Sequence, residues 1–263
     1  MAAHEPEAIG RPDSPREPDA WSVPYRVRFD EAGPDGLLRT SVLLRYAQDV
    51  AWHHSTIRGY DRAWYAERGL AWLVRAAEVG VAMPIPVGSE LVGTTRVVGW
   101  RRVWARRGTE FRDARGGLVA WAQIDWVLLD GRGAPTRIPA EFEPVFGAAT
   151  TTVGLARVAL GDVPADALRS TIAVRPHELD PMAHVNNAVY ADWMEESVIA
   201  AGDGAATRLI PRIERLEYAA PADGAARLVA DTWPAAGGWS FRVRDGSGAD
   251  LLRARLEPGR TKG

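Results

Sequence analysis

Residues 178–197 read ELDPMAHVNNAVYADWMEES, and this stretch combines a predicted helix start with two side chains that can carry chemistry. Asp180 lies four residues before His184, and Asn186 or Asn187 can cap the N-terminus of the helix that follows. A helix N-terminus presents unpaired backbone N–H groups and partial positive charge, so it can stabilise a developing oxyanion. A carboxylate and an imidazole beside it are the minimum for general-base activation of water.

The same two side chains also have plainer interpretations. Asp180 precedes Pro181, which is typical of a turn, and His184 is equally compatible with a hydrogen-bonded histidine in the loop before the helix. The spacing of the two residues therefore leaves the catalytic and the structural interpretation open.

We expect the helix to cover about residues 186–200. Its stripe of residues at helical spacing includes Val189 and Trp193 and continues through Glu196. Because of this position, we expect Glu196 to point towards the interior or the sheet edge, where it is a candidate catalytic acid. We expect Glu195 to lie on the solvated face.

Four side chains are candidates for contact with a substrate. Gln48 lies within the apolar stripe of an earlier predicted helix, so its amide must find a partner in the core or in a substrate. Asp49 is its neighbour on that helix. Tyr190 and Trp193 are expected first as packing residues and second as substrate contacts.

Two segments of the chain repeat one plan. Each begins with a strand and a turn, continues into one substantial helix and ends in about four strands. A single helix followed by an antiparallel sheet predicts an α+β fold, in which a curved sheet wraps around the helix and covers its apolar stripe. The predicted parts are a disordered tail over 1–20, a first domain over 21–147, a linker over 148–169, a second domain over 170–258 and a tail over 259–263.

Two adjacent histidines, His53 and His54, stand near the predicted C-terminus of the first helix, where positive charge is favoured and residues are usually exposed. Metal ligands on one helix face need a spacing of three or four residues, which adjacent histidines do not provide. We therefore predict no metal site.

The chain of 263 residues carries a formal net charge of −2 and contains no cysteine. This charge gives no reason to expect nucleic acid or a membrane surface as a partner. Without cysteine, disulfides, thiolate metal sites and cysteine nucleophiles are excluded. Residues 1–20 lack the apolar core of a signal peptide, and no apolar run reaches the roughly 20 residues needed to cross a bilayer, so we expect a cytoplasmic protein.

The stretch HVNNAVYADWMEES closely resembles the HVNN…Y…W…E signature of hotdog-fold thioesterases, and Asp180 stands where these families place their loop aspartate. In the first half, DEAGPDGLLRTSVLLRYAQDVAWHH, LAWLVRAAEV and RIPAEF are similar to the N-terminal domain of plant and bacterial acyl-ACP thioesterases. The resemblance covers about residues 21–257 and implies two tandem hotdog domains in one chain. In two places the sequence departs from the family: Met182 replaces a common asparagine, and Pro221 and Ala222 replace a Glu-Cys pair.

The resemblance implies hydrolysis of acyl thioesters, foremost acyl-ACP, to free fatty acids without a cofactor. Asp180 would position or activate water or attack the carbonyl, and His184 would relay the proton or hold the thioester oxygen. Backbone N–H groups at Asn186 and Asn187 would stabilise the oxyanion. Either these groups suffice, or Glu196 from the helix, or Gln48 or Asp49 from the other domain, assists.

Three alternatives stay open from the sequence: an acyl-CoA thioesterase, a hotdog dehydratase or hydratase, and a non-catalytic acyl-binding protein. The expected partner is an acyl thioester of acyl carrier protein or of coenzyme A. The two domains would pair within a monomer, or the chain would form a homodimer.

Overall fold

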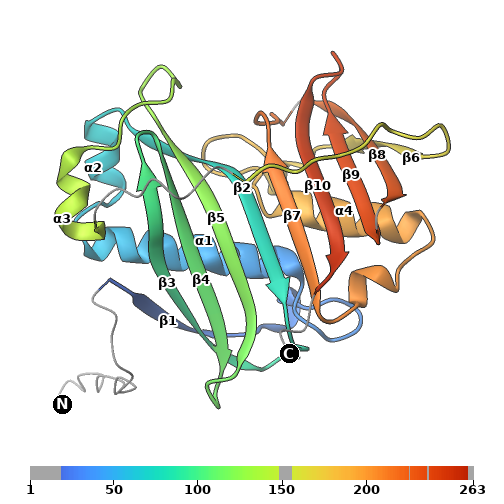
Figure 1. Cartoon of the computed structure of the whole chain (residues 1–263), viewed down its shortest axis with the longest axis horizontal. Helices are drawn as coiled ribbons and strands as arrows, with labels where there is room; N and C mark the ends of the chain where they lie inside the picture. The colour runs from blue at the N-terminus through green and yellow to red at the C-terminus, as the bar shows by residue number, and fades with distance from the viewer. Residues whose placement is uncertain (1–18, 148–155, 225, 236, 260–263) are drawn as a thin grey trace, which may run out of the picture.

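A ten-stranded antiparallel sheet carries the two longest helices of the described chain against one face (Figure 1). The computed structural model describes residues 19–147, 156–224, 226–235 and 237–259, so most of the predicted N-terminal tail and part of the predicted linker lie outside the described residues. In the order in which they pair, the strands are β1 (Trp21–Arg26), β3 (Glu90–Arg101), β4 (Trp104–Asp113), β5 (Leu118–Leu129), β2 (Ala71–Val81), β7 (Arg212–Tyr218), β10 (Asp250–Pro258), β9 (Gly238–Arg244), β8 (Arg227–Ala235) and β6 (Leu168–Ala173).

The two halves of the sheet use their strands in the same order. From the outer edge inwards, each half places its first, third, fourth, fifth and second strand. The two halves meet where β2 pairs with β7, with Ala76 opposite Glu217 and Val81 opposite Arg212. The predicted α+β class with a large antiparallel sheet is confirmed.

Helices α1 (Thr40–Ile57) and α4 (Val189–Ala200) lie behind the sheet in Figure 1 and contact each other. The predicted apolar stripe of α1 is buried, and Leu43 within it has no exposed surface. Truncating such a side chain to alanine costs about 2–5 kcal/mol, so the stripe holds the helix on the sheet. The shorter helical segments are η1 (Phe29–Glu31), α2 (Arg62–Glu67), η2 (Ala140–Phe142), α3 (Glu143–Phe146), η3 (Pro176–Glu178) and η4 (Ala206–Arg208).

The expectation that both adjacent histidines are exposed is wrong for His54. Its side chain is fully buried, and its ring packs edge-on against Phe146 at 5.6 Å between centroids. The guanidinium of Arg107 lies 2.9 Å from Nδ1. Burial, followed by the charges of Arg107 and Arg58, lowers the pKa of His54 to about 3, so the ring is a neutral part of the core.

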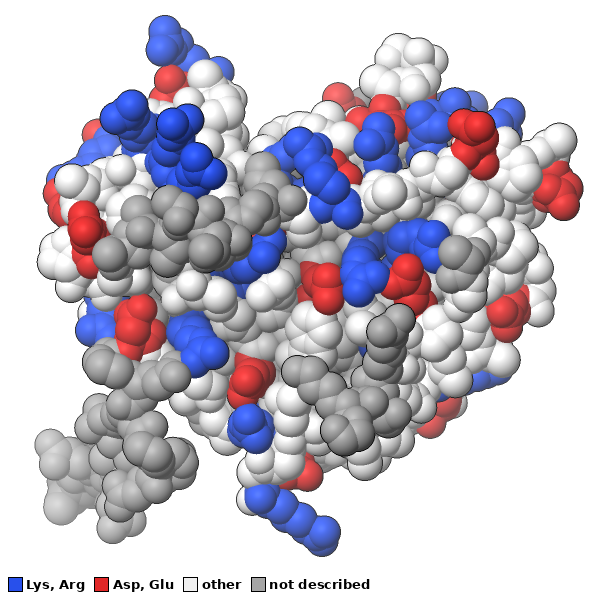
Figure 2. All heavy atoms as spheres, viewed as in Figure 1, with Lys and Arg blue, Asp and Glu red and all other residues white. Residues whose placement is uncertain are grey.

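Basic and acidic side chains are mixed over the sheet face that points away from the helices (Figure 2). One group crosses the junction between the two halves: Arg215 on β7 lies 3.0 Å from Glu78 on β2 and also contacts Glu257 on β10. The pair of Arg215 with Glu78 links the two half-sheets where β2 and β7 meet. No helix among the described residues is long and apolar enough to cross a membrane.

A buried polar cluster joins α1 to α4 and β7 at this junction. The Thr40 hydroxyl donates to Glu195 Oε1 at 2.8 Å, and Arg212 Nη2 donates to the same hydroxyl oxygen at 2.9 Å. Glu214 lies behind them without exposed surface, and neither of its oxygens accepts a hydrogen bond from a described residue. Burial, and next the charge of Glu195, raises the pKa of Glu214 well above its ordinary value, so the protonated form is favoured.

Glu214 should make folding stability depend on pH. The folded protein holds the Glu214 proton to a higher pH than the unfolded chain does, so its contribution to stability is present below pH 4.5 and is lost as the pH rises. Glu214→Gln cannot ionise and should show a flatter decline of the free energy of unfolding, measured by urea denaturation from pH 4.5 towards neutrality. Replacing the exposed Glu90 by glutamine should keep the wild-type slope. An unchanged slope in Glu214→Gln would contradict this account.

Candidate active site

The loop from Asp180 to Asn187 connects η3 to α4 and is closed by its own backbone. Asp180 N–H donates to the His184 carbonyl at 2.8 Å, and Ala183 N–H donates to the Asp180 carbonyl at 2.9 Å. Ala183 has a φ of 61°, a left-handed conformation that non-glycine residues rarely adopt. This tight turn holds Asp180 and His184 in one loop, as the sequence predicted.

The carboxylate of Asp180 is half-buried, and one of its two oxygens takes part in this turn. Its Oδ1 accepts hydrogen bonds from Met182 N–H at 2.8 Å and from His184 N–H at 3.3 Å. No hydrogen bond from a described residue reaches Oδ2. The turn role that the sequence suggested is therefore present, and it fixes the carboxylate while leaving one oxygen for other chemistry.

Asp223, which the sequence did not single out, lies directly opposite His184. The two residues form an isolated antiparallel bridge, and Val185 N–H donates to the Ala222 carbonyl at 2.9 Å beside it. That hydrogen bond makes His184 and Asp223 a non-hydrogen-bonded pair, the arrangement in which facing side chains lie closest and on the same face. His184 is half-buried and Asp223 is exposed, so both side chains can be reached from solvent.

The predicted helix start at Asn186 or Asn187 is wrong by two to three residues, because α4 begins at Val189 with Ala188 in the capping position. The Asn186 side chain instead forms a turn: its Oδ1 accepts from Ala188 N–H at 2.9 Å, and its carbonyl accepts from Val189 N–H at 2.9 Å. These two N–H groups are therefore used. The N–H of Asn187 has no acceptor among the described residues, so it is the donor left for a ligand.

The predicted aromatic contacts lie mainly in the core. Tyr190 is 2% exposed and Trp193 5%, and their rings meet edge to face at 4.9 Å. Trp193 Nε1–H donates to Glu178 Oε1 at 3.2 Å. Tyr218, whose ring also packs edge-on against Tyr190, donates its hydroxyl hydrogen to the Asn187 carbonyl at 2.8 Å and so ties the loop to β7. Packing is the role that these contacts show.

The two acids on α4 have exchanged their expected orientations. Glu195, predicted on the solvated face, belongs to the buried cluster with Thr40, whereas Glu196 is exposed. Glu196 lines a pocket of about 590 Å³ that Asp180 and His184 do not line. Partial burial, followed by the charge of the nearby Asp192, raises the pKa of Glu196.

The two candidate residues on α1 are accessible. Gln48 is half-buried, and its Nε2 donates to the Leu44 carbonyl one turn earlier at 3.2 Å. Asp49 is exposed and accepts a hydrogen bond from the Tyr25 hydroxyl at 2.7 Å. No hydrogen bond or ion pair between described residues joins either of them to Asp180 or His184.

The first half of the chain contains a copy of the candidate loop in residues 31–42. Three backbone hydrogen bonds of this loop correspond to three of the second loop. Gly33 N–H donates to the Leu37 carbonyl at 2.8 Å, as Asp180 N–H does to His184, and Gly36 N–H donates to the Gly33 carbonyl at 2.9 Å, as Ala183 N–H does to Asp180. Leu38 N–H donates to the Ile85 carbonyl at 2.8 Å, as Val185 N–H does to Ala222. Gly36 has a positive φ of 76° at the position of Ala183. Gly33 and Leu37 thus stand in place of Asp180 and His184, so the loop over 31–42 lacks the carboxylate and the imidazole of the second loop.

The helices after the two loops are in matching register. Tyr46 on α1 donates to Glu31 Oε2 at 2.5 Å, and Trp193 on α4 donates to Glu178, the equivalent acid of the second loop. Counting onwards from these aromatic residues, Gln48 on α1 is the counterpart of Glu195 on α4.

Two family descriptions match the chain. The N-terminal domain of acyl-ACP thioesterases matches residues 18–144, and the C-terminal domain matches residues 162–221. An acyl-[acyl-carrier-protein] hydrolase of Cuphea viscosissima, named as chloroplastic, is 24% identical over 188 residues, which are 66% of this chain and 46% of the relative. The chain spans about half the length of the curated relatives it matches.

Solved structures share the fold over nearly the whole chain. A protein assigned as an oleoyl thioesterase from Lactobacillus plantarum has a TM-score of 0.81 at 16% identity, covering 92% of this chain and 97% of its own. The 12:0-ACP thioesterase from Umbellularia californica has a TM-score of 0.76 at 23% identity, covering 90% and 96%. Because the two matched domains together span the greater part of the sequence, the chain belongs to the acyl-ACP thioesterase family.

Proposed function

We propose that the protein hydrolyses acyl thioesters, with acyl-ACP as the substrate and acyl-CoA as the nearest alternative, and releases the free fatty acid. Family membership supports the class of reaction. The observation that carries the assignment to a site is the loop of Asp180 and His184, which places a carboxylate oxygen, an imidazole and an unused backbone N–H beside the start of α4.

The proposal includes two hotdog domains in tandem, over residues 21–147 and 170–258, each wrapped around its own helix. The identical strand order of the two half-sheets and the copied loop over 31–42 support this division. It also includes a cytoplasmic location, which the absence of cysteine supports.

In the proposed reaction, water adds to the thioester carbonyl carbon while Asp180 Oδ2 orients it. His184 takes the proton that the water loses. The carbonyl oxygen becomes an oxyanion, and the N–H of Asn187, next to the start of α4, stabilises its charge. When the carbon–sulfur bond breaks, His184 returns the proton to the sulfur, and the products are a fatty acid and a free thiol.

Asp223 supplies the carboxylate that steadies His184 in this proposal. Its place opposite His184 across the bridge supports this role, since an acid beside an imidazole favours the charged form that appears during the reaction. Met182 has no side-chain group that can do the same, and it is 50% exposed.

Gln48 and Asp49 are proposed to face the substrate from the other half of the protein. Their counterparts on α4, Glu195 and Glu196, line a pocket together with the loop over 33–39. Since the two halves repeat each other, this relation supports a position of Gln48 and Asp49 facing the loop over 180–186. The acyl chain would then lie between helix and sheet.

Asp180→Asn should separate the chemical role of this residue from its turn role. The amide oxygen can still accept from Met182 and His184 N–H, but it cannot carry charge, so kcat for thiol release should fall by about 10²- to 10⁴-fold while the protein stays folded. In His184→Ala, kcat for thiol release should fall by a similar factor. The exposed His177, replaced by alanine, is the matched control and should keep the wild-type rate. Wild-type rates in both loop variants would sink the assignment.

Asp223→Asn should lower kcat by about tenfold with little change in KM, because it removes support for the charged imidazole and touches no substrate group. The decisive comparison uses the His184→Ala background, where the same change at Asp223 should have no further effect. An equal loss in both backgrounds would show that Asp223 acts independently of His184.

The carrier is tested by measuring kcat/KM for matched acyl chains on acyl carrier protein and on coenzyme A. We expect the higher value for the protein carrier. The reverse order would assign the chain to acyl-CoA, and formation of an enoyl product from a 3-hydroxyacyl thioester without thiol release would replace hydrolysis by dehydration.

A further inference from the structure

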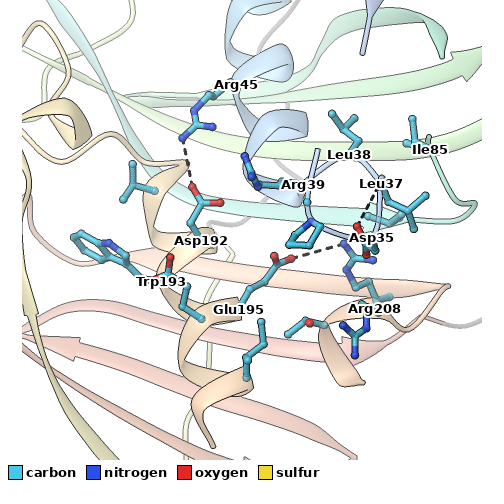
Figure 3. A pocket seen from close by; sticks show the side chains of 18 of the residues that line it. Asp35, Leu37, Leu38, Arg39, Arg45, Ile85, Asp192, Trp193, Glu195 and Arg208 are labelled. Carbon is cyan, nitrogen blue, oxygen red and sulfur yellow. Dashed lines mark hydrogen bonds and ion pairs between the residues drawn. The ribbon is translucent and has the colours of Figure 1, made fainter. Parts of the chain in front are cut away.

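A pocket of about 590 Å³ lies between the two halves, outside the loop of Asp180 and His184 (Figure 3). The first-half loop over residues 33–39, one side of α4 and the segment 207–212 line it. In Figure 3, Asp192, Trp193 and Glu195 come from α4, and Leu37 and Leu38 lie across from them. The pocket therefore sits at the copy of the candidate loop and not at the loop with Asp180 and His184.

The repeat makes this pocket the counterpart of the proposed thioester site. Its loop keeps the backbone hydrogen bonds of the reactive loop, but Gly33 and Leu37 replace the carboxylate and the imidazole. A site that keeps its shape and loses its acid and base can bind the same kind of molecule without the means to hydrolyse it.

Much of the lining suits an alkyl chain. Its apolar side chains include Leu37, Leu38, Ile85, Val189, Ile199 and Ile210. Ile199 is 54% exposed although it is apolar, so its surface is available to cover a ligand. Burial of each methylene from water contributes about 0.8 kcal/mol, so a chain of several carbons has a substantial driving force to enter.

Charged side chains of both signs line the pocket, and the acids Asp35 and Glu196 lie among its arginines without an ion pair to a described residue. Asp192 is paired with Arg45 at 3.4 Å, and Glu195 is held by Thr40 and Arg212. Arg39 and Arg208, both exposed, form no ion pair with any described residue. In Figure 3, Arg208 lies on the opposite side of the pocket from Trp193, so an apolar tail and an anionic or carbonyl head have separate places.

We propose that this pocket is a second acyl-chain site, which binds an acyl group without hydrolysing it and holds its head near Arg39 and Arg208. The choice of an acyl ligand rests on the proposed function, because the acyl group is the substrate of the matching loop. The same acyl chain can arrive as the free fatty acid or on a thioester, and the experiment separates these sources.

The test is the binding stoichiometry of the intact protein, measured by isothermal titration with saturated fatty acids from octanoate to stearate and with alkyl-CoA thioethers, which cannot be hydrolysed. Wild type should bind two equivalents. Ile199→Glu, which places a charge on the apolar wall, and Arg208→Glu, which reverses the head-group charge, should each lose one equivalent or weaken it by about tenfold or more.

The matched control is Ile57→Glu, because Ile57 is an exposed isoleucine at the end of α1 that does not line this pocket. It should bind two equivalents like wild type. His184→Ala should retain the binding that Ile199→Glu removes, while Ile199→Glu should retain thiol release.

The outcomes distinguish the second acyl-chain site from the proposed thioesterase function. Loss of one equivalent in Ile199→Glu supports the second site, even if the protein fails to release thiol and the proposed function is wrong. Binding of the free acid alone identifies the reaction product as the occupant, and binding of the thioether alone identifies the thioester. Binding unchanged in both Ile199→Glu and Arg208→Glu, or no binding of either probe, overturns the proposal.

Discussion

The antiparallel pairing of β2 with β7 fixes how the two half-sheets and their helices are arranged. It joins two half-sheets of the same strand order into one sheet, with Ala76 opposite Glu217 near one end. Both helices must then cover the same face, and α1 and α4 come into contact. The buried cluster of Thr40, Glu195 and Arg212 forms only because of this contact, since its three members come from two helices and a strand of different halves.

An antiparallel pair at the centre also relates the two halves approximately by a two-fold axis, so we expect the loop of each half to face the helix of the other. The observed pocket shows one such approach, between the loop over 33–39 and α4. The two loops form the same backbone hydrogen bonds, whereas their side chains differ. The fold thus accounts for two similar loops, and the side chains account for the carboxylate and imidazole that only the second of these two loops carries.

The sequence was a good guide to features that depend on neighbouring residues. Asp180 and His184 share one tight loop before a helix, as their spacing suggested. The orientation of Glu195 and Glu196 was not accessible in this way, because adjacent helical residues point about 100° apart and only the position of α1 decides which one is inward. Asp223 was missed because it meets His184 only through a bridge between distant segments.

Two other errors have similar physical causes. The Asn186 side chain forms a turn with Ala188 and so delays the helix, although asparagine is a good helix cap in general. His54 lies near the end of an amphipathic helix, but the segment containing Phe146 covers it and excludes water. In both cases a local preference was overruled by contacts that a single segment does not reveal.

We propose that thioester chemistry takes place at the second loop and not at its copy. The most direct measurement is a crystal structure of Asp180→Asn with a bound alkyl-CoA thioether. We predict that its sulfur lies between His184 and the N–H of Asn187, with the chain running towards α1. A sulfur bound beside Gly33 and Leu37, with the loop over 180–187 unoccupied, would contradict the account.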